Sequence, residues 1–191
     1  MKYVALLLES GHTVFTYDFL QDILWIGNKN TLKGIVKSLL KSKVLVAIHP
    51  WYRGLPGFDQ YEFASKLKSP SYITCETVLQ QEAVIFQDYS SECTLVWTNT
   101  VTVDIEDYQY RFRKMKLEIL LDPLGVHKTQ AKQIASKERA ICDMLYYVPN
   151  YYFDNIGSID IELMEKLSQI YPKITQRSIY LLIQDAQNEE S

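Results

Sequence analysis

Residues 16–54 read TYDFLQDILWIGNKNTLKGIVKSLLKSKVLVAIHPWYRG, and their pattern predicts how the first part of the chain folds. Apolar residues recur at helical spacing over 16–25, after Thr16 as a capping residue. A short turn around Gly27 follows. A second amphipathic helix then begins, with Asn30 or Thr31 as its expected N-cap. Helix, glycine-containing turn and basic helix are the order of a helix-turn-helix.

The segments on either side complete this pattern. Residues 44–48 are β-prone, and residues 49–57 are rich in turn formers and hold Trp51, Tyr52 and Arg53. Ahead of the two helices lie a short apolar helix, Lys2 to Glu9, and a strand candidate at 13–15. We therefore predict a winged helix-turn-helix DNA-binding domain over residues 1–57.

The charge distribution predicts what this domain binds. Between Asp22 and Asp59 there is no carboxylate, and this stretch carries +6 while the other residues sum to −9. Four of its lysines are four residues apart, which places them along one side of a helix. Such a row fits a phosphate backbone, although a merely solvated helix face is the alternative. The expected DNA-binding residues are Asn28, Lys29, Asn30, Thr31, Lys33, Lys37, Lys41 and Arg53.

Length and composition bound the rest. A chain of 191 residues with 47% hydrophobic content makes one or two domains. Its cysteines, three in number, have no metal-ligand spacing, and no targeting or membrane-spanning segment is evident. We expect reduced thiols and a cytoplasmic protein.

Residues 58–191 read as a C-terminal domain. A helix over 58–68 precedes a brief strand and a helix capped at Thr74. Four short strands are predicted at 94–98, 100–103, 108–113 and 117–121, and helices at 137–147 after the Ser136 cap, 160–170 and 175–186. The predicted class is α+β, with the winged helix followed by a mixed α/β domain that holds a small, mainly antiparallel sheet.

Two segments of this domain carry a family resemblance. Residues 69–79, SPSYITCETVL, and residues 134–146, IASKERAICDMLY, follow a basic winged helix in the same order and at the same separation as two motifs of the AbiEi family. The chain resembles these type IV antitoxins and abortive-infection regulators from about Val14 to Tyr147. It departs at Val78, where the family often has alanine, and at residues 81–83, where the family has a His-Gly turn.

The resemblance implies a repressor of its own operon that binds operator DNA and counters a cognate nucleotidyltransferase-like toxin, with no stable complex required. Its second motif supplies the antitoxin-domain candidates Glu138, Arg139 and Asp143. A structural role also fits these residues, because Glu138 favours a helix N-terminus and Asp143 lies one turn from Arg139. The alternative function is a winged-helix regulator whose C-terminal domain dimerises or senses a ligand, without a toxin partner. A homodimer is compatible with either function.

An enzyme is the least favoured class. Asp104, Glu106, Asp107 and Glu118 resemble the paired carboxylates of metal-dependent nucleases, but no lysine follows Glu118 at the required spacing. The histidines are isolated and no glycine-rich phosphate loop is present. We therefore predict no catalytic residues, no metal and no cofactor, and neither an enzyme nor a membrane partner.

Overall fold

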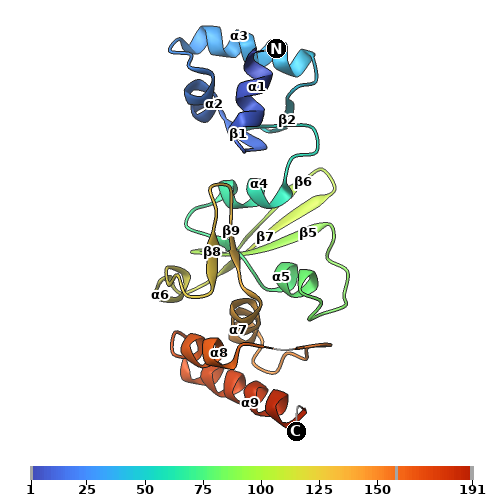
Figure 1. The fold of residues 1–191 in the computed structure, drawn as a ribbon, viewed down its shortest axis with the longest axis vertical. Coiled ribbons are helices and arrows are strands. Elements are labelled where there is room, and N and C mark those ends of the chain that lie inside the picture. The colour runs from blue at the N-terminus through green and yellow to red at the C-terminus, as the bar shows by residue number, and fades with distance from the viewer. Residues whose placement is uncertain (1, 158, 190–191) are drawn as a thin grey trace. The chain divides into compact units, whose positions relative to one another are not determined.

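The computed structural model describes residues 2–157 and 159–189. The chain forms two compact units, Met1–Lys66 and Leu67–Ser191. Both units contain helices and a sheet (Figure 1), so the α+β class is confirmed. The sequence predicted a division after residue 57, whereas the units divide after Lys66.

The first unit contains a three-stranded antiparallel sheet, in the order β1-β3-β2. Along the chain a helix, a strand, two helices and a two-stranded hairpin follow one another in the predicted order, and one further helix, α4, closes the unit. The elements are α1 (Lys2–Glu9), β1 (Val14–Thr16), α2 (Tyr17–Leu24), α3 (Lys29–Lys41), β2 (Val46–His49), β3 (Tyr52–Gly54) and α4 (Gln60–Leu67).

Capping residues fix where α2 and α3 begin. The Thr16 hydroxyl accepts the N–H of Phe19 at 3.2 Å, which confirms the predicted cap of α2. The N-cap of α3 is Asn28, so the prediction of Asn30 or Thr31 is wrong. Asn28 has an extended backbone, and its Oδ1 accepts the N–H groups of Asn30 at 2.8 Å and Thr31 at 3.2 Å. Its side chain therefore satisfies two N–H groups that a helix start leaves unpaired.

The core of the first unit comes from the inner faces of its helices. α2 and α3 contribute apolar residues at helical spacing, and they pack with α1, β1 and the segment that leads into β2. The buried cluster contains Leu7, Phe15, Leu20, Leu24, Ile26, Leu32, Val36, Leu39 and Leu45.

Glu62 attaches α4 to the first unit. Its side chain is almost fully buried, with Oε2 accepting the N–H of Thr13 at 2.7 Å and the Thr13 hydroxyl at 2.6 Å. Its Oε1 lies 2.6 Å from Nζ of Lys66 and 2.8 Å from Nδ1 of His12. Burial alone raises the pKa of Glu62, but the hydrogen bonds from Lys66, Thr13 and His12 bring that pKa below its ordinary value. These contacts explain why the division falls after α4.

The second unit is built on a six-stranded mixed sheet in the order β6-β7-β5-β4-β9-β8. Among the described residues, three of its strand pairings are antiparallel, and two, β5–β7 and β4–β9, run parallel, so the sheet is mixed although most of its pairings are antiparallel, as predicted. The strands are β4 (Tyr72–Ile73), β5 (Glu92–Trp97), β6 (Val101–Ile105), β7 (Tyr108–Lys114), β8 (Val126–Lys128) and β9 (Gln133–Ala135).

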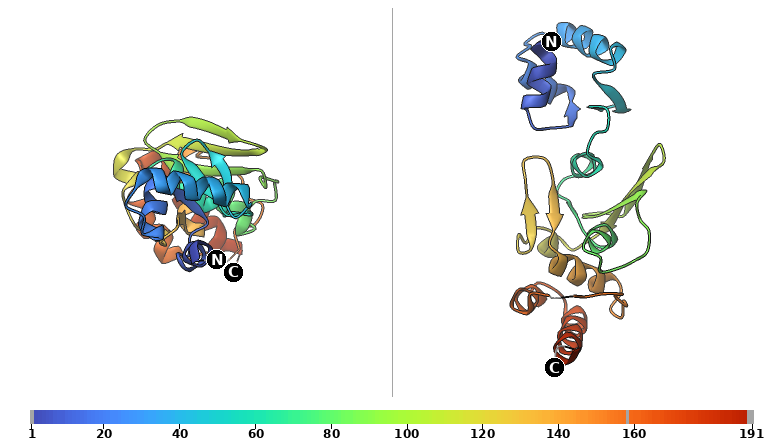
Figure 2. Two further views of the ribbon diagram at one scale, coloured as in Figure 1. Left: turned by 90° about the horizontal axis from the view of Figure 1, so that it is seen from above. Right: turned by 45° about the vertical axis from the view of Figure 1, so that its right-hand side comes forward.

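Helix α7 lies between the sheet and the pair α8–α9 (Figures 1 and 2). The helices of this unit are α5 (Glu76–Gln81), α6 (Leu117–Leu120), α7 (Lys137–Tyr147), α8 (Ile161–Ser168) and α9 (Lys173–Glu189). The bounds and the Ser136 cap of α7 are as predicted. No helix in the described part of the chain combines the length and apolar character needed to cross a membrane.

Two predictions in this unit are wrong. Residues 117–120 form the short helix α6 instead of a strand, with Leu121 as its C-cap; Ile119 and Leu120 are buried, and Leu117 and Leu121 are exposed. On a strand Leu117, Ile119 and Leu121 would share one face, but Ile119 is buried and the other two are exposed. Thr74 does not cap α5, because Cys75 is the N-cap residue and the Thr74 hydroxyl bonds elsewhere.

Candidate nucleic-acid interface and the buried polar network

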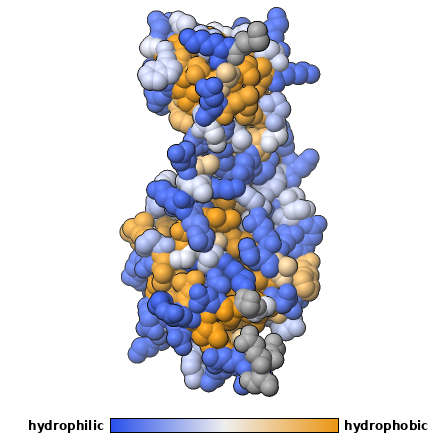
Figure 3. Space-filling model, in the orientation of Figure 1, coloured by the Kyte–Doolittle hydropathy of each residue, from blue (hydrophilic) through white to orange (hydrophobic). Residues whose placement is uncertain are grey.

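The exposed side of α3 carries the predicted lysine row. Lys29, Lys33, Lys37 and Lys41 are all exposed, while the opposite side of the helix is buried in the core. In the described part of the first unit, the lysine that pairs with a carboxylate is Lys66, and none of these four does. The rim of the first unit along which α3 runs is mostly hydrophilic in Figure 3. The row therefore keeps its charge available to an external anion.

The beginning of α3 adds polar groups to this row. The side chains of Asn28, Asn30 and Thr31 are exposed. Asn28 uses its Oδ1 as the helix cap, so this predicted DNA-binding residue also has a structural role. The positive end of the helix dipole lies at the same place, which favours a phosphate there.

Arg53 occupies the hairpin of β2 and β3 but turns toward its own backbone. Its Nη1 donates to the carbonyl oxygens of Tyr52 at 2.8 Å and His49 at 2.9 Å. Its guanidinium also lies 5.2 Å from the ring centre of Tyr17. The sequence predicted that both aromatics of the hairpin pack back on the domain. Tyr52 does so through its ring contact with Phe63, whereas Trp51 is 72% exposed.

In the second unit the two segments of the family resemblance meet. The first forms β4 and α5, and the second forms β9 and α7. β4 pairs with β9 in parallel through Ile73 and Ile134. Side chains from both segments, with Tyr171, then form one buried polar network. Its members are Tyr72, Thr74, Arg139, Asp143 and Tyr171.

The network is fully bonded around Asp143. One carboxylate oxygen accepts the hydroxyls of Thr74 at 2.7 Å and Tyr72 at 3.0 Å, and the other accepts Tyr171 at 2.6 Å. The Tyr72 oxygen in turn accepts Nη2 of Arg139 at 2.9 Å. Tyr72 therefore bridges the two charges as acceptor and donor.

Arg139 and Asp143 confirm the predicted pairing one turn apart, with 3.4 Å between Nε and Oδ1 and both side chains 0% exposed. Burial raises the pKa of Asp143, and Arg139 opposes that rise. Burial and the Asp143 charge raise the pKa values of Tyr72 and Tyr171 well above normal. The phenols thus keep their protons and donate to the carboxylate. This arrangement is closed to solvent and fits a structural role.

The guanidinium of Arg139 ends at backbone carbonyls. Nη2 donates to Ile119 at 2.7 Å and Nη1 donates to Leu124 at 2.9 Å. Gly125 makes room for it, because a Cβ at this residue would lie 2.9 Å from the Cβ of Arg139 and its φ is +69°. A side chain at Gly125 would thus be strained and crowded.

Glu138 lies outside the network. Its Oε1 accepts the N–H of Asp160 at 3.4 Å, at the start of α8. Sequence reasoning missed Tyr72, Thr74 and Tyr171. Tyr72 and Thr74 alternate within the first motif, which was a usable signal for one shared strand face.

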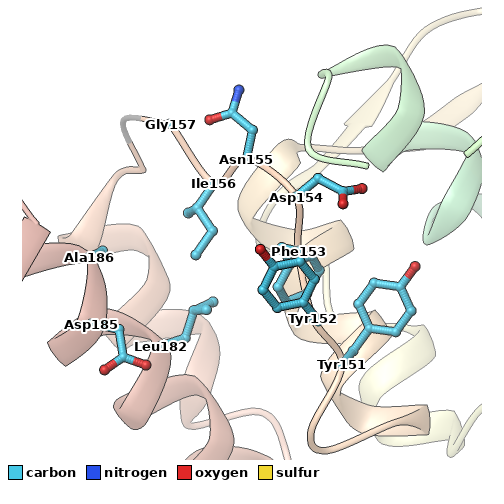
Figure 4. A pocket seen from close by; sticks show the side chains of 10 residues that line it. All are labelled: Tyr151, Tyr152, Phe153, Asp154, Asn155, Ile156, Gly157, Leu182, Asp185 and Ala186. Carbon is cyan, nitrogen blue, oxygen red and sulfur yellow. The ribbon is translucent and has the colours of Figure 1, made fainter. Parts of the chain in front are cut away.

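A separate pocket of about 550 Å³ lies between residues 151–157 and α9 (Figure 4). Ile156 and Leu182 extend into the space between the two segments, and Tyr152 stands beside them. Asp154 points away from α9 and accepts the N–H of Phe86 at 2.9 Å. None of the predicted site residues lines this pocket.

Comparison with known proteins adds no family assignment. A scan against models of protein families finds no match, and a search of curated proteins finds none.

Proposed function

We propose that this chain is a DNA-binding transcriptional regulator whose first unit is a winged helix-turn-helix. The observation that carries the proposal is the row of four exposed lysines on α3, backed by the buried side of the same helix. On an α3 placed in a DNA groove, the lysines contact phosphates, and Asn30 and Thr31 lie near base edges.

Topology and charge support this proposal. The order of α1, β1, α2, α3, β2 and β3, with the sheet order β1-β3-β2, fits the proposed winged helix. The first unit has eight Lys and Arg against five Asp and Glu, a net charge of +3, and the second unit has −6. A polyanion is therefore attracted to the first unit and repelled by the second.

We extend the proposal to an autorepressor that is also the antitoxin of a type IV toxin-antitoxin system, acting in the cytoplasm against a nucleotidyltransferase-like toxin. What supports this extension is the resemblance of residues 69–79 and 134–146 to the AbiEi family, together with their packing against each other. Tyr72 lies in the first of these segments and Asp143 in the second, and the two side chains bond to each other in the buried network. The resemblance therefore concerns the fold of this unit.

A salt series on DNA from upstream of the gene tests the DNA-binding function. Four to six phosphate contacts give a logarithmic slope of about −4 to −5 against salt. Replacing both Lys33 and Lys37 by glutamate should abolish the shift. The matched control replaces exposed Lys116 and Lys173, which lie outside the first unit, by glutamate and changes net charge equally. A flat salt dependence, or equal loss in the control, contradicts the proposal.

The pocket beside α9 favours one second candidate, a regulator that senses a small ligand without a toxin partner. The neighbouring gene separates the two functions. Growth rescue from an adjacent nucleotidyltransferase-like toxin supports the antitoxin. A ligand that changes DNA affinity, together with no rescue, supports the sensor.

A further inference from the structure

The outer edge of the second unit's sheet is formed by β6. β6 pairs with β7 on one side, and no further strand follows it in the sheet order. No other ribbon of this unit lies beyond it in Figures 1 and 2. The opposite edge strand, β8, has three residues and includes His127 and Lys128. β6 has five residues, with neither the lysine nor the proline that commonly protects an edge.

The hairpin register shows which backbone groups point outward. β6 and β7 are joined by the two residues 106 and 107, and Ile105 faces Tyr108. The closing pair of a two-residue hairpin exchanges both backbone hydrogen bonds, and bonded pairs alternate along the strand. Val101, Val103 and Ile105 therefore bond to β7, while Thr102 and Asp104 direct their N–H and C=O groups outward. In the described residues, no backbone bond from another segment reaches this edge.

We propose that β6 is a dimerisation edge, at which β6 of a second copy of this chain pairs antiparallel about a two-fold axis at Val103. In this register, Thr102 of each copy faces Asp104 of the other. These are the two residues with free outward groups, so the two facing pairs form four backbone hydrogen bonds. The sequence of β6 is therefore complementary to itself.

The side chains agree with the same register. Thr102 and Asp104 are exposed on one face of the sheet. Oδ1 of Asp104 accepts Nε2 of Gln109 at 2.8 Å, so its second oxygen is left for the hydroxyl of Thr102 of the second copy. On the opposite face Val101 meets Ile105, and Val103 meets its own copy. These three residues are half-buried, and the pairing covers their remaining apolar surface.

The consequence for DNA rests on the proposed function, but the interface does not. A two-fold dimer carries two DNA-binding units and binds two half-sites related by the same symmetry.

Engineered cysteines test the register in the full chain, whose own cysteines are buried and free. Val103→Cys places two thiols at a non-hydrogen-bonded pair, where Cα atoms are about 4.5 Å apart and a disulfide can form. We expect mild oxidation to cross-link this variant as a dimer. Thr102→Cys alone, although more exposed, should stay monomeric on a non-reducing gel. A mixture of Thr102→Cys and Asp104→Cys proteins should cross-link between the two variants.

A second variant removes the pairing without a thiol. Thr102→Pro deletes an outward N–H, a position where an edge strand tolerates proline. Sedimentation should show a concentration-dependent dimer for the native chain and a monomer for this variant, with unchanged circular dichroism. The proposal would be overturned if all single variants cross-linked equally or if the native chain stayed monomeric at every concentration. It would also be overturned if Val103→Cys cross-linked only to a foreign protein. If the chain binds DNA but is always monomeric, the dimerisation edge is wrong and the proposed function stands. A dimer that binds no DNA overturns the proposed function alone.

Discussion

Arg139 and Asp143 are a charged pair that the second unit buries completely. Removing water from two charges is costly, and here that cost is offset by hydrogen bonds with two tyrosines and a threonine and by donation from Arg139 to two backbone carbonyls. Removing only one of the two residues therefore leaves the other charge buried without its partner.

Arg139→Met should lower the free energy of unfolding of the second unit by about 3–5 kcal/mol, because it leaves the Asp143 carboxylate buried without its counterion. The double variant with Asp143→Leu should lose less than the two single losses combined, as measured in urea by circular dichroism and by hydrogen exchange of α7. Glu138→Gln is the control on the same helix and should change stability by less than about 0.5 kcal/mol. A stable Arg139→Met protein that fails only in toxin rescue would show that the pair is functional.

The sequence predicts part of this network. Arg139 and Asp143 are one helical turn apart, so their pairing follows from spacing. Tyr171 is 28 residues from Asp143 and lies between two helices, where no periodic pattern indicates which way it points. Contacts of that kind depend on how α8 and α9 return to α7, which local preferences do not determine.

The start of α3 combines a structural and a proposed DNA-binding role in Asn28. Asn28→Asp keeps the acceptor oxygen, so helix stability should be retained. Its new negative charge should weaken DNA binding, because it faces phosphate. Asn28→Ala should instead cost about 1 kcal/mol of stability through loss of the cap. Melting curves and DNA titrations on both variants check this. Equal DNA affinity for Asn28→Asp and the native chain would place the bound phosphates away from this end.

The attachment of α4 to the first unit should weaken at low pH. The folded pKa of Glu62 lies below its ordinary value of 4.5, so its stabilisation is complete above that value and is lost as pH falls through the folded pKa. Glu62→Gln should cost about 1–3 kcal/mol at neutral pH, because the Lys66 ammonium and Thr13 lose a charged acceptor. The difference between the two proteins should shrink toward pH 3, as measured by hydrogen exchange of residues 60–67. A difference that grows with acidity contradicts the assigned role of Glu62.

The elements that the sequence predicts well are those with a cap and an amphipathic repeat, such as α2 after Thr16 and α7 after Ser136. Residues 117–121 lack both a cap side chain and enough length to distinguish a helix from a strand. β8 and β9 were missed because each has three residues, and His127 and Lys128 give no alternation. These two strands form because they pair within the sheet, β9 with β4 and β8 with β9.

Charge and motifs are divided between the two units. The lysine row lies in the first unit, and residues 69–79 and 134–146 lie in the second. The proposed function therefore predicts two activities that can be separated.

Replacing both Lys33 and Lys37 by glutamate should abolish operator binding and derepress the operon, because each change adds repulsion to the lost attraction. Cells that express the cognate toxin should still be rescued by this protein. A reporter assay and a toxin-rescue growth assay, run on the same variant and on residues 67–191 alone, measure the two activities. Rescue by residues 1–66 alone, or loss of rescue in a charge-reversed protein that remains folded, contradicts the division.

The contact between Asp143 and Tyr171 also sets an order of events during synthesis. The first unit is complete in sequence at Lys66. The second unit needs β4 to pair with β9 and Tyr171 to reach α7, so a ribosome must release at least 171 residues before the network closes. Domains that emerge first generally fold first. A nascent chain paused before Tyr171 would therefore display a finished lysine-bearing unit attached to an incomplete one.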